Sequence, residues 1–230
     1  MAVSLISQFQ GQDTQRLQAV WQQLGPHSCP YHYNFHLHTR CSDGQMEPEH
    51  LIEQAVGLGL SGLAITDHHS VLGYQRAQRW LDSFFSYSSP ALDLTLWTGV
   101  EITSDLAGTE VHILGYGFDP SHPALAPYLT GERPQQGDKI ASKVIQSLHQ
   151  AGGLVVLAHP ARYRQPASRL IPLAVQLGID GVEAYYAYGN PKPWHSSPPQ
   201  MEEICHFSDL YGLFRTCGTD SHGESILYRL

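Results

Sequence analysis

The sequence predicts a single α/β domain in which strands and helices alternate. The chain has 230 residues, of which 42% are hydrophobic and 15% charged, enough apolar material for one sizeable core. Short apolar runs typical of buried strands alternate along it with segments of helical periodicity. Histidines and carboxylates follow several of these runs where the strands end, as they do at the functional face of parallel α/β proteins.

Residues 1–32 are predicted to form a helical segment that precedes the main domain, which spans residues 33–230. The stretch DTQRLQAVWQQLG offers Asp13 as a helix cap and places apolar residues such as Leu17 and Trp21 at helical spacing. A Gly-Pro pair then ends the helix.

From residue 33 onward, the chain is expected to alternate between strands and helices. The strand-like runs lie at 33–37, 62–66, 94–102, 110–116, 153–158, 180–184 and 213–217. Helix-like segments lie at 47–59, 74–86, 138–151, 168–177 and 199–211. Because helical crossovers connect parallel strands, a parallel sheet or barrel is the expected arrangement. Two stretches rich in proline and glycine, 119–137 and 188–199, are expected to be loops.

The composition argues against several classes of protein. No window is apolar over the length of a membrane span, and no secretory signal pattern opens the chain, so cytoplasm is the expected location. The four cysteines are far apart and form no CxxC pair, which argues against a zinc ribbon or a disulfide scaffold. A formal charge of −8 argues against a broad basic surface for long nucleic acid. A short phosphorylated ligand remains compatible, because it needs only a few local arginines.

Ionisable residues gather on six of the predicted strands. The motifs that carry them are HLHTRCSDG, TDHH, GVEI, VHILGY, AHP and GTDSH, and most of them stand at a strand end. The residues concerned are His36, His38, Asp43, Asp67, His68, Glu101, His112, His159, Asp220 and His222. In a parallel barrel the carboxyl ends of the strands meet on one face, so these side chains are expected to lie together there.

These residue types predict a metal site. Imidazole nitrogen and carboxylate oxygen suit divalent ions such as Mn²⁺, Zn²⁺ or Fe²⁺. The spacing of His36 and His38 places both rings on one side of a strand. A carboxylate such as Glu101 can bridge two ions about 3.5–4 Å apart, which is the arrangement that clamps an in-line displacement at phosphorus and activates a water.

Each motif also has a plain structural explanation when it is taken alone. Asp67 fits a helix cap, Glu101 a buried ion-pair partner, and His112 a hydrogen-bonded core histidine. Together, however, these explanations would require unrelated buried polar groups on six strands at one rim. A shared metal site is therefore favoured over separate structural roles. The remaining histidines are read as surface or packing residues, namely His27, His32, His50, His122, His149 and His206. His195 is undecided, and His69 is read as a pocket residue rather than a ligand.

With these motifs, the chain resembles the PHP family, named for polymerase and histidinol phosphatase domains. The resemblance runs from about Tyr33 to His222 and uses the blocks HLHTRCSDG, LAITDHH, GVEI, VHILGY, LAHP and GTDSH in order. It implies a distorted (βα)7 barrel with three divalent ions at the C-terminal end of its strands. By position, it implies a first ion on His36, His38, Glu101 and Asp220, a second on Glu101, His112 and His159, and a third on Asp43, His68 and His222.

Within the family, SDG, TDH and AHPARY look most like the branch of 3',5'-nucleotide bisphosphate phosphatases and 5'-3' exoribonucleases. This likeness marks Asp67 and Arg162 as candidate catalytic residues: Asp67 orients a ligand or water, and Arg162 clamps phosphate. Arg40 and Arg164 either assist or are solvated surface charges. The branch usually has a substantial inserted subdomain between the GVEI and AHP blocks, whereas only the short segment 117–137 is available here. The substrate is therefore not carried over.

The leading interpretation is a metal-dependent phosphoesterase that hydrolyses a phosphomonoester of a nucleotide or another small phosphorylated metabolite by means of metal-activated hydroxide. One alternative is a 5'-3' exonuclease on short 5'-phosphorylated oligonucleotides. A second is a metal-stabilised regulatory module without turnover. A third, a metal-dependent amidohydrolase, is weakened by the lack of a visible lysine at a strand end. The oligomeric state and the role of the two loops are not readable from the sequence.

Overall fold

The computed structural model describes residues 11–87 and 94–230. Its helices are α2 (Thr14–Trp21), α3 (Pro48–Leu58), α4 (Leu72–Tyr87), α5 (Ala141–Gln150), α6 (Ala167–Gln176) and α7 (Pro198–Tyr211). Its strands are β1 (Tyr33–Asn34), β2 (Gly62–Ala64), β3 (Thr95–Trp97), β4 (Gly99–Leu106), β5 (Thr109–Tyr116), β6 (Leu154–Leu157), β7 (Gly181–Tyr185) and β8 (Phe214–Cys217). A mixed α/β fold is therefore confirmed. Each helix predicted after residue 33 is present close to its expected bounds.

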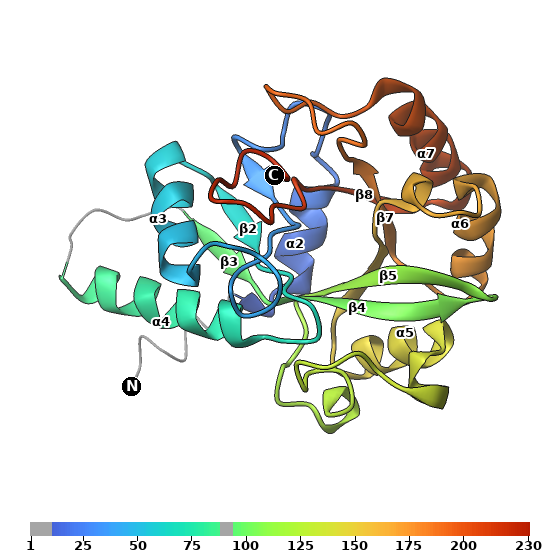
Figure 1. Cartoon of the computed structure of the whole chain (residues 1–230), viewed down its shortest axis with the longest axis horizontal. Coiled ribbons are helices and arrows are strands. Elements are labelled where there is room, and N and C mark those ends of the chain that lie inside the picture. Colours follow the sequence, from blue (N-terminus) through green and yellow to red (C-terminus); the bar gives the residue numbers. More distant parts are fainter. Residues whose placement is uncertain (1–10, 88–93) are drawn as a thin grey trace.

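The strands form two sheets. β1, β2 and β3 are parallel neighbours in one sheet, and the other has the order β4-β5-β6-β7-β8. Figure 1 shows α3 and α4 beside the smaller sheet and α5, α6 and α7 around the larger one. None of the helices within residues 11–87 and 94–230 combines the length and apolar character of a membrane span.

Two strands differ from the expected parallel pattern. The predicted run 94–102 is divided into β3 and β4 at Thr98, whose hydroxyl donates to the Phe118 carbonyl at 2.9 Å. β5 is antiparallel to both β4 and β6. The physical reason is the tight turn at Ala107 and Gly108, which have φ of 51° and 79°. Such a two-residue turn joins antiparallel strands and leaves no room for a crossover helix.

Main-chain contacts of residues that follow β1 and β2 join the smaller sheet to both edges of the larger one. After β1, the amide of Phe35 donates to the carbonyl of Cys217 on β8 at 3.0 Å, and a further bridge joins Leu37 to Ser221. After β2, a bridge joins His68 to Glu101 on β4. The carboxyl ends of β1, β2 and β8 are therefore close to one another and to the first half of β4, where Glu101 lies.

Helix α2 packs at the opposite, amino end of the parallel strands. The Trp21 ring lies edge-on to Tyr116 with centroids 5.3 Å apart, and it also contacts Phe214 at the start of β8. Leu17 and Trp21 belong to the same buried apolar cluster as Phe35. The helical spacing read from DTQRLQAVWQQLG therefore reflects the face by which α2 is buried.

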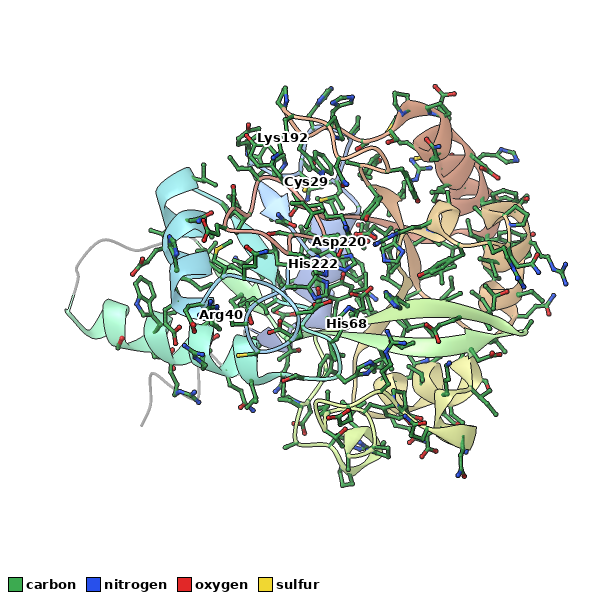
Figure 2. All side chains as sticks on the ribbon, in the orientation of Figure 1. Cys29, Arg40, His68, Lys192, Asp220 and His222 are labelled. Carbon is green, nitrogen blue, oxygen red and sulfur yellow. The ribbon has the colours of Figure 1, made fainter. Side chains whose placement is uncertain are left out.

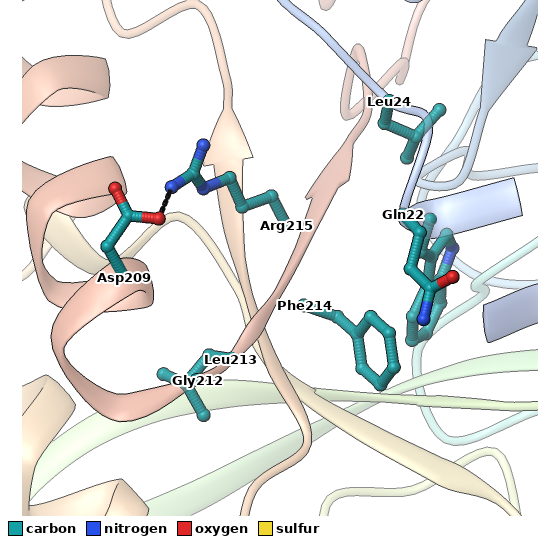
Figure 3. A pocket seen from close by; sticks show the side chains of 8 residues that line it. Gln22, Leu24, Asp209, Gly212, Leu213, Phe214 and Arg215 are labelled. Atoms are coloured by element: carbon teal, nitrogen blue, oxygen red, sulfur yellow. Dashed lines mark hydrogen bonds and ion pairs between the residues drawn. The ribbon is translucent and has the colours of Figure 1, made fainter. Parts of the chain in front are cut away.

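A surface pocket of about 280 Å³ opens beside this end of the molecule. Figure 3 shows it between Gln22 and Leu24 on one side and the start of β8 on the other, with the Arg215 side chain held by Asp209. Phe214 and Arg215 precede Asp220 on the β8 side, so this pocket lies away from the strand ends at which the ionisable residues gather.

Candidate metal centre

The HLH motif leaves β1 with its two histidines on the same side. His36 and His38 are fully buried, and their ring centroids are 5.2 Å apart. Leu37, between them, belongs to the apolar cluster formed with α3 and α4. The alternation of an extended chain thus directs both imidazoles to the strand-end face.

Glu101 on β4 lies at the centre of a group of histidines. Its Oε2 is 3.0 Å from Nε2 of His36 and 3.0 Å from Nε2 of His38. Its Oε1 is 2.7 Å from Nδ1 of His112 and 3.4 Å from Nε2 of His159. The two oxygens of one buried carboxylate therefore face different pairs of imidazoles, which is the arrangement that a bridging ligand requires.

His112 reaches this group because β5 is antiparallel. It lies in the first half of β5, opposite Thr103 on β4, rather than at a carboxyl end. The hairpin brings β5 back alongside β4, so His112 lies two register positions from Glu101, which stands in the first half of β4 and pairs with Leu114. His112 thus lies beside the other predicted ligands, as expected. It does so because β5 is antiparallel to β4, and not because it ends a parallel strand.

Asp220, which follows β8, uses its two oxygens differently. Oδ1 lies 3.4 Å and 3.3 Å from the Nε2 atoms of the two HLH histidines. Oδ2 accepts hydrogen bonds from Arg162 Nη1 at 2.8 Å, Tyr186 Oη at 2.7 Å and Arg229 Nε at 2.8 Å. Three donors occupy Oδ2, whereas Oδ1 faces the imidazoles with which it could share a metal ion.

Gly218 explains why the GTDSH motif begins with glycine. A Cβ atom at this position would lie 2.2 Å from the Cβ of His36 and 2.9 Å from Oε1 of Glu183. Only glycine allows the end of β8 to come this close to β1.

A more open group lies next to the buried one. Oδ2 of Asp43 is 3.3 Å from Nε2 of His222 and 3.7 Å from Nε2 of His68. Oδ1 of Asp43 is 3.5 Å from Nδ1 of His38. Figure 2 shows His68, Asp220 and His222 in the central part of the molecule. All nine predicted ligands are thus brought together, in groups that share His38 and Glu101.

The donor atoms fit divalent metal ions. Ligands about 2.1 Å from one ion lie about 3.0–3.4 Å from each other, which matches the nitrogen-oxygen distances around Glu101 and Asp220. The ring nitrogens of His38 and of His159 are buried and make no hydrogen bond of regular geometry, although Nε2 of each ring lies within 3.4 Å of a Glu101 oxygen. Unpartnered buried polar atoms are costly, and a metal ion would satisfy them.

The charges of the centre compensate for its burial. Burial by itself raises the pKa of Glu101, but His36 and His112 outweigh it and hold this pKa well below the usual range. Burial lowers the pKa of His38, but Asp220 and Glu101 outweigh it and raise this pKa to about 9. Without metal, protons on imidazole therefore neutralise the carboxylates, and incoming cations have to displace them.

We therefore expect metal affinity to increase as the pH rises toward about 9, the pKa of His38 without metal. The sign follows because the protonated imidazole cannot bind a cation and the deprotonated one can. Calorimetric titration of Mn²⁺ in buffers of different ionisation enthalpy would measure the protons released at each pH. Affinity that is independent of pH, with no proton release, would contradict this expectation.

Asp67 contacts the loop that carries Asp43. Its Oδ1 accepts hydrogen bonds from the Thr39 amide at 2.7 Å and the Ser42 hydroxyl at 2.8 Å, and its Oδ2 from the Thr39 hydroxyl at 2.7 Å. Asp67 thus holds residues 39–42 against the end of β2. Its proposed influence on the ligands would act through the position of this loop.

The three arginines considered from the sequence have different surroundings. Arg162 lies in the short 3-10 helix after β6 and donates to both Asp220 and Tyr186. Arg40 is largely exposed, with its Nη1 3.4 Å from Glu47. Arg164 is also exposed. Of the three, Arg162 is the one held at a predicted metal ligand.

The histidines set aside from the sequence lie elsewhere. His122 is half-buried and caps the 3-10 helix Pro123–Leu125, and the other five are exposed. His195 is exposed as well, with Nδ1 3.2 Å from the Pro193 carbonyl. His69 is buried at 3% exposure, and its Nε2 lies 3.2 Å from the Thr103 hydroxyl.

Glu183 on β7 is a site residue that sequence reasoning missed. Its Oε1 accepts a hydrogen bond from Nδ1 of His36 at 2.9 Å, and its Oε2 accepts one from the amide of His159 at 2.8 Å. The carboxylate is 1% exposed. The available signal was one acidic residue within the apolar run DGVEAYY. Tyr186 and Arg229, the other donors to Asp220, stand in no recognisable motif.

Comparison with known proteins supports the geometric reading. Residues 34–126 match the family model of the PHP domain. The 5'-3' exoribonuclease Rnm of Escherichia coli is 30% identical over 192 residues, which cover 76% of this chain and 61% of that protein. The 3',5'-nucleoside bisphosphate phosphatase of Chromobacterium violaceum is 31% identical over 119 residues, covering 52% of this chain and 39% of that protein. The chain thus spans less than two thirds of the length of either relative.

A solved structure shares the fold. It is a provisionally assigned metal-dependent phosphoesterase from Bifidobacterium adolescentis, with a TM-score of 0.68 and 24% sequence identity. The similarity covers 85% of this chain and 89% of that chain.

Proposed function

From the match of residues 34–126 to the PHP domain, we propose that this chain is a metal-dependent phosphoesterase. The substrate is a phosphomonoester of a nucleotide or another small phosphorylated metabolite. The observation that carries the proposal is the buried Glu101 carboxylate, whose two oxygens face different imidazoles beside Asp220. This arrangement suits two bridged ions and, through them, displacement at phosphorus.

The ligand sets that we propose follow the sequence motifs. His36, His38, Glu101 and Asp220 would hold one ion, Glu101 with His112 and His159 a second, and Asp43, His68 and His222 a third. The first set coincides with a group whose ligand atoms lie within 4.8 Å of one another, and the third set lies within such a group that also contains His38. In the remaining set, His112 and His159 both approach Oε1 of Glu101. Manganese, zinc and iron all match the donor types.

When bound, the ions would lower the pKa of a water and neutralise charge that develops on the phosphoryl group. The chain itself positions the reacting groups. Glu183 fixes the ring of His36 through Nδ1, and Asp67 holds the loop that carries Asp43. Arg162 stands beside Asp220 with 40% of its side chain exposed, so its remaining N–H groups are available to orient a phosphate.

We further propose that the two sheets form a distorted seven-stranded barrel, with β3 as a short addition to β2. The main-chain contacts from β1 to β8 and from β2 to β4 support a closed ring of strands, and antiparallel β5 accounts for the distortion. Of the predicted segment 1–32, residues 1–10 lie outside the described residues, and residues 11–32 would close the amino end of this barrel through Trp21. A cytoplasmic location remains a prediction.

A second candidate is a 5'-3' exonuclease that acts on short 5'-phosphorylated oligonucleotides. Its support is the similarity to the exoribonuclease of E. coli over 76% of this chain. The formal charge of −8 favours short substrates over long nucleic acid. The same metal centre would serve both activities.

We expect the purified manganese-loaded protein to release phosphate from at least one phosphomonoester, and a chelator to abolish this activity reversibly. The panel should include a nucleoside 3',5'-bisphosphate, a nucleoside monophosphate, histidinol phosphate and a 5'-phosphorylated tetranucleotide. Elemental analysis gives the metal content. Because metal binds the folded state, a hundredfold excess of Mn²⁺ over its dissociation constant should raise the Tm by about 5–10 °C.

The outcomes separate the candidates. Preference for the tetranucleotide favours the exonuclease, and preference for a small ester favours the phosphatase. Bound metal and a raised Tm without turnover on any ester would instead indicate a regulatory module.

A further inference from the structure

A second hollow adjoins the metal centre on the side of Asp43 and His68. It has a volume of about 370 Å³ and is also lined by Ser42, His69, Thr103 and residues 131–133. This volume lies within the range of small-molecule sites, which begins at about 300 Å³. Because Asp43 and His68 line it, a ligand in this pocket is continuous with one bound at the proposed metal ions.

The segment between β5 and α5 forms one wall of this pocket. Leu125 and Tyr128 of this segment are buried in the main apolar core. The amide of Gly131 donates to the carbonyl of His69 at 2.8 Å. The wall is thus anchored both to the core and to the residue next to His68.

Arg133 places a cation at the pocket. Its Nη1 is 3.3 Å from Oε1 of Glu110, while Oε2 of the same carboxylate is 2.7 Å from Lys139 Nζ. Two cations therefore share one carboxylate, so Glu110 does not neutralise both of them. The Arg133 side chain is 65% exposed, so its other N–H groups are open to a ligand.

The carboxylates of the pocket lining are unequally placed. Asp43 is turned toward His222, His68 and His38 and belongs to the metal centre. Glu132 is exposed, and it is the acidic group that would oppose an anion there.

We propose that this pocket binds the part of the substrate beyond the scissile phosphate, and that Arg133 pairs there with a second phosphate. The inference rests on the proposed phosphoesterase function and specifies its substrate class. The second phosphate is carried either on the same nucleoside or by the next nucleotide of a short oligomer. Guanidinium groups suit such a partner because they offer parallel N–H donors to phosphate oxygens.

The test compares adenosine 3',5'-bisphosphate, adenosine 5'-monophosphate and a 5'-phosphorylated dinucleotide as substrates of the manganese-loaded protein. Arg133→Ala should raise KM about tenfold for a substrate with the second phosphate and leave its kcat unchanged. The KM for the monophosphate should stay within about twofold. Glu132→Gln should lower KM for the doubly charged substrate, because it removes the opposing charge.

Lys139→Ala is the matched control, since Lys139 pairs with the same carboxylate but does not line the pocket. It should leave KM for all three substrates within about twofold. An effect of Arg133→Ala on the bisphosphate places the second phosphate on the same nucleoside, and an effect confined to the dinucleotide places it on the next one. If Arg133→Ala changes all three substrates equally, or none, the inference is wrong while the phosphoesterase function stands.

If the wild-type protein releases phosphate from no ester, the proposed function fails. The inference about the pocket is then tested by nucleotide binding alone. Calorimetric titration of the same nucleotides into the manganese-loaded protein would then be measured. Binding of the bisphosphate or dinucleotide about tenfold tighter than the monophosphate, and lost in Arg133→Ala, supports the pocket. Equal affinities overturn it.

Discussion

Asp220→Ala is expected to lower phosphoesterase turnover by about a thousandfold or more, because the loss of an ion removes several kcal/mol of charge stabilisation from the transition state. Oδ1 of this carboxylate faces His36 and His38, and Oδ2 takes three hydrogen bonds, so the substitution removes both a proposed ligand atom and the acceptor of three donors. The measurement is kcat of the manganese-loaded variant, together with its metal content.

The controls separate catalysis from folding. Removing a buried carboxylate leaves Arg162 and Arg229 without their partner, which is itself destabilising. Asp220→Asn keeps the shape of the side chain, and its thermal unfolding should be compared with that of wild type. Asp209→Ala removes a carboxylate that is 75% exposed and paired with Arg215, and it should leave kcat within about twofold. Unchanged turnover in a folded Asp220→Ala protein would refute the proposed metal centre.

Glu183→Gln is expected to weaken metal binding about 10–100-fold, the usual cost of losing a carboxylate behind a metal-binding histidine. Glu183 accepts the Nδ1 proton of His36 and so presents Nε2 to the ion. An amide at this position holds the ring less firmly and makes its nitrogen a poorer ligand. Competition with a chromophoric chelator would measure the dissociation constant.

A structural role alone would leave a different signature. Glu183 also accepts the amide of His159, so Glu183→Gln will cost some stability in any case. If the role were only structural, Tm would fall while the metal dissociation constant stayed the same. Glu203→Gln, the same substitution at an exposed position of α7, should change neither quantity.

The nine proposed ligands could be found from the sequence because short-range rules govern them. An HxH spacing on an extended chain places two rings on one face, as His36 and His38 show. Motifs that end strands bring Asp43, His68, His159, Asp220 and His222 toward one rim. Glu101 joins them from the first half of β4 rather than from the expected strand end. His112 was found for an incomplete reason, since the hairpin rather than a parallel strand brings it there.

The residues around the ligands could not be found in this way. Glu183, Tyr186 and Arg229 act through contacts between segments far apart in the chain, such as the 147 residues that separate Glu183 from His36. Arg133 was missed for the same reason: its relation to His69 depends on how the segment after β5 folds back onto the end of β2. Local helix and strand propensities carry no information about such long-range contacts.

The sequence by itself therefore determined the α/β class, the positions of the helices and the set of side chains that we propose as metal ligands. Each of these follows from periodicity or spacing within a few residues. Only the tertiary structure decided that β5 reverses direction, that three donors occupy Oδ2 of Asp220, and that Arg133 stands at a pocket beside the metal centre. The physical reason is that hydrogen bonds and charges act over a few ångströms in space, whereas sequence patterns report only neighbours along the chain.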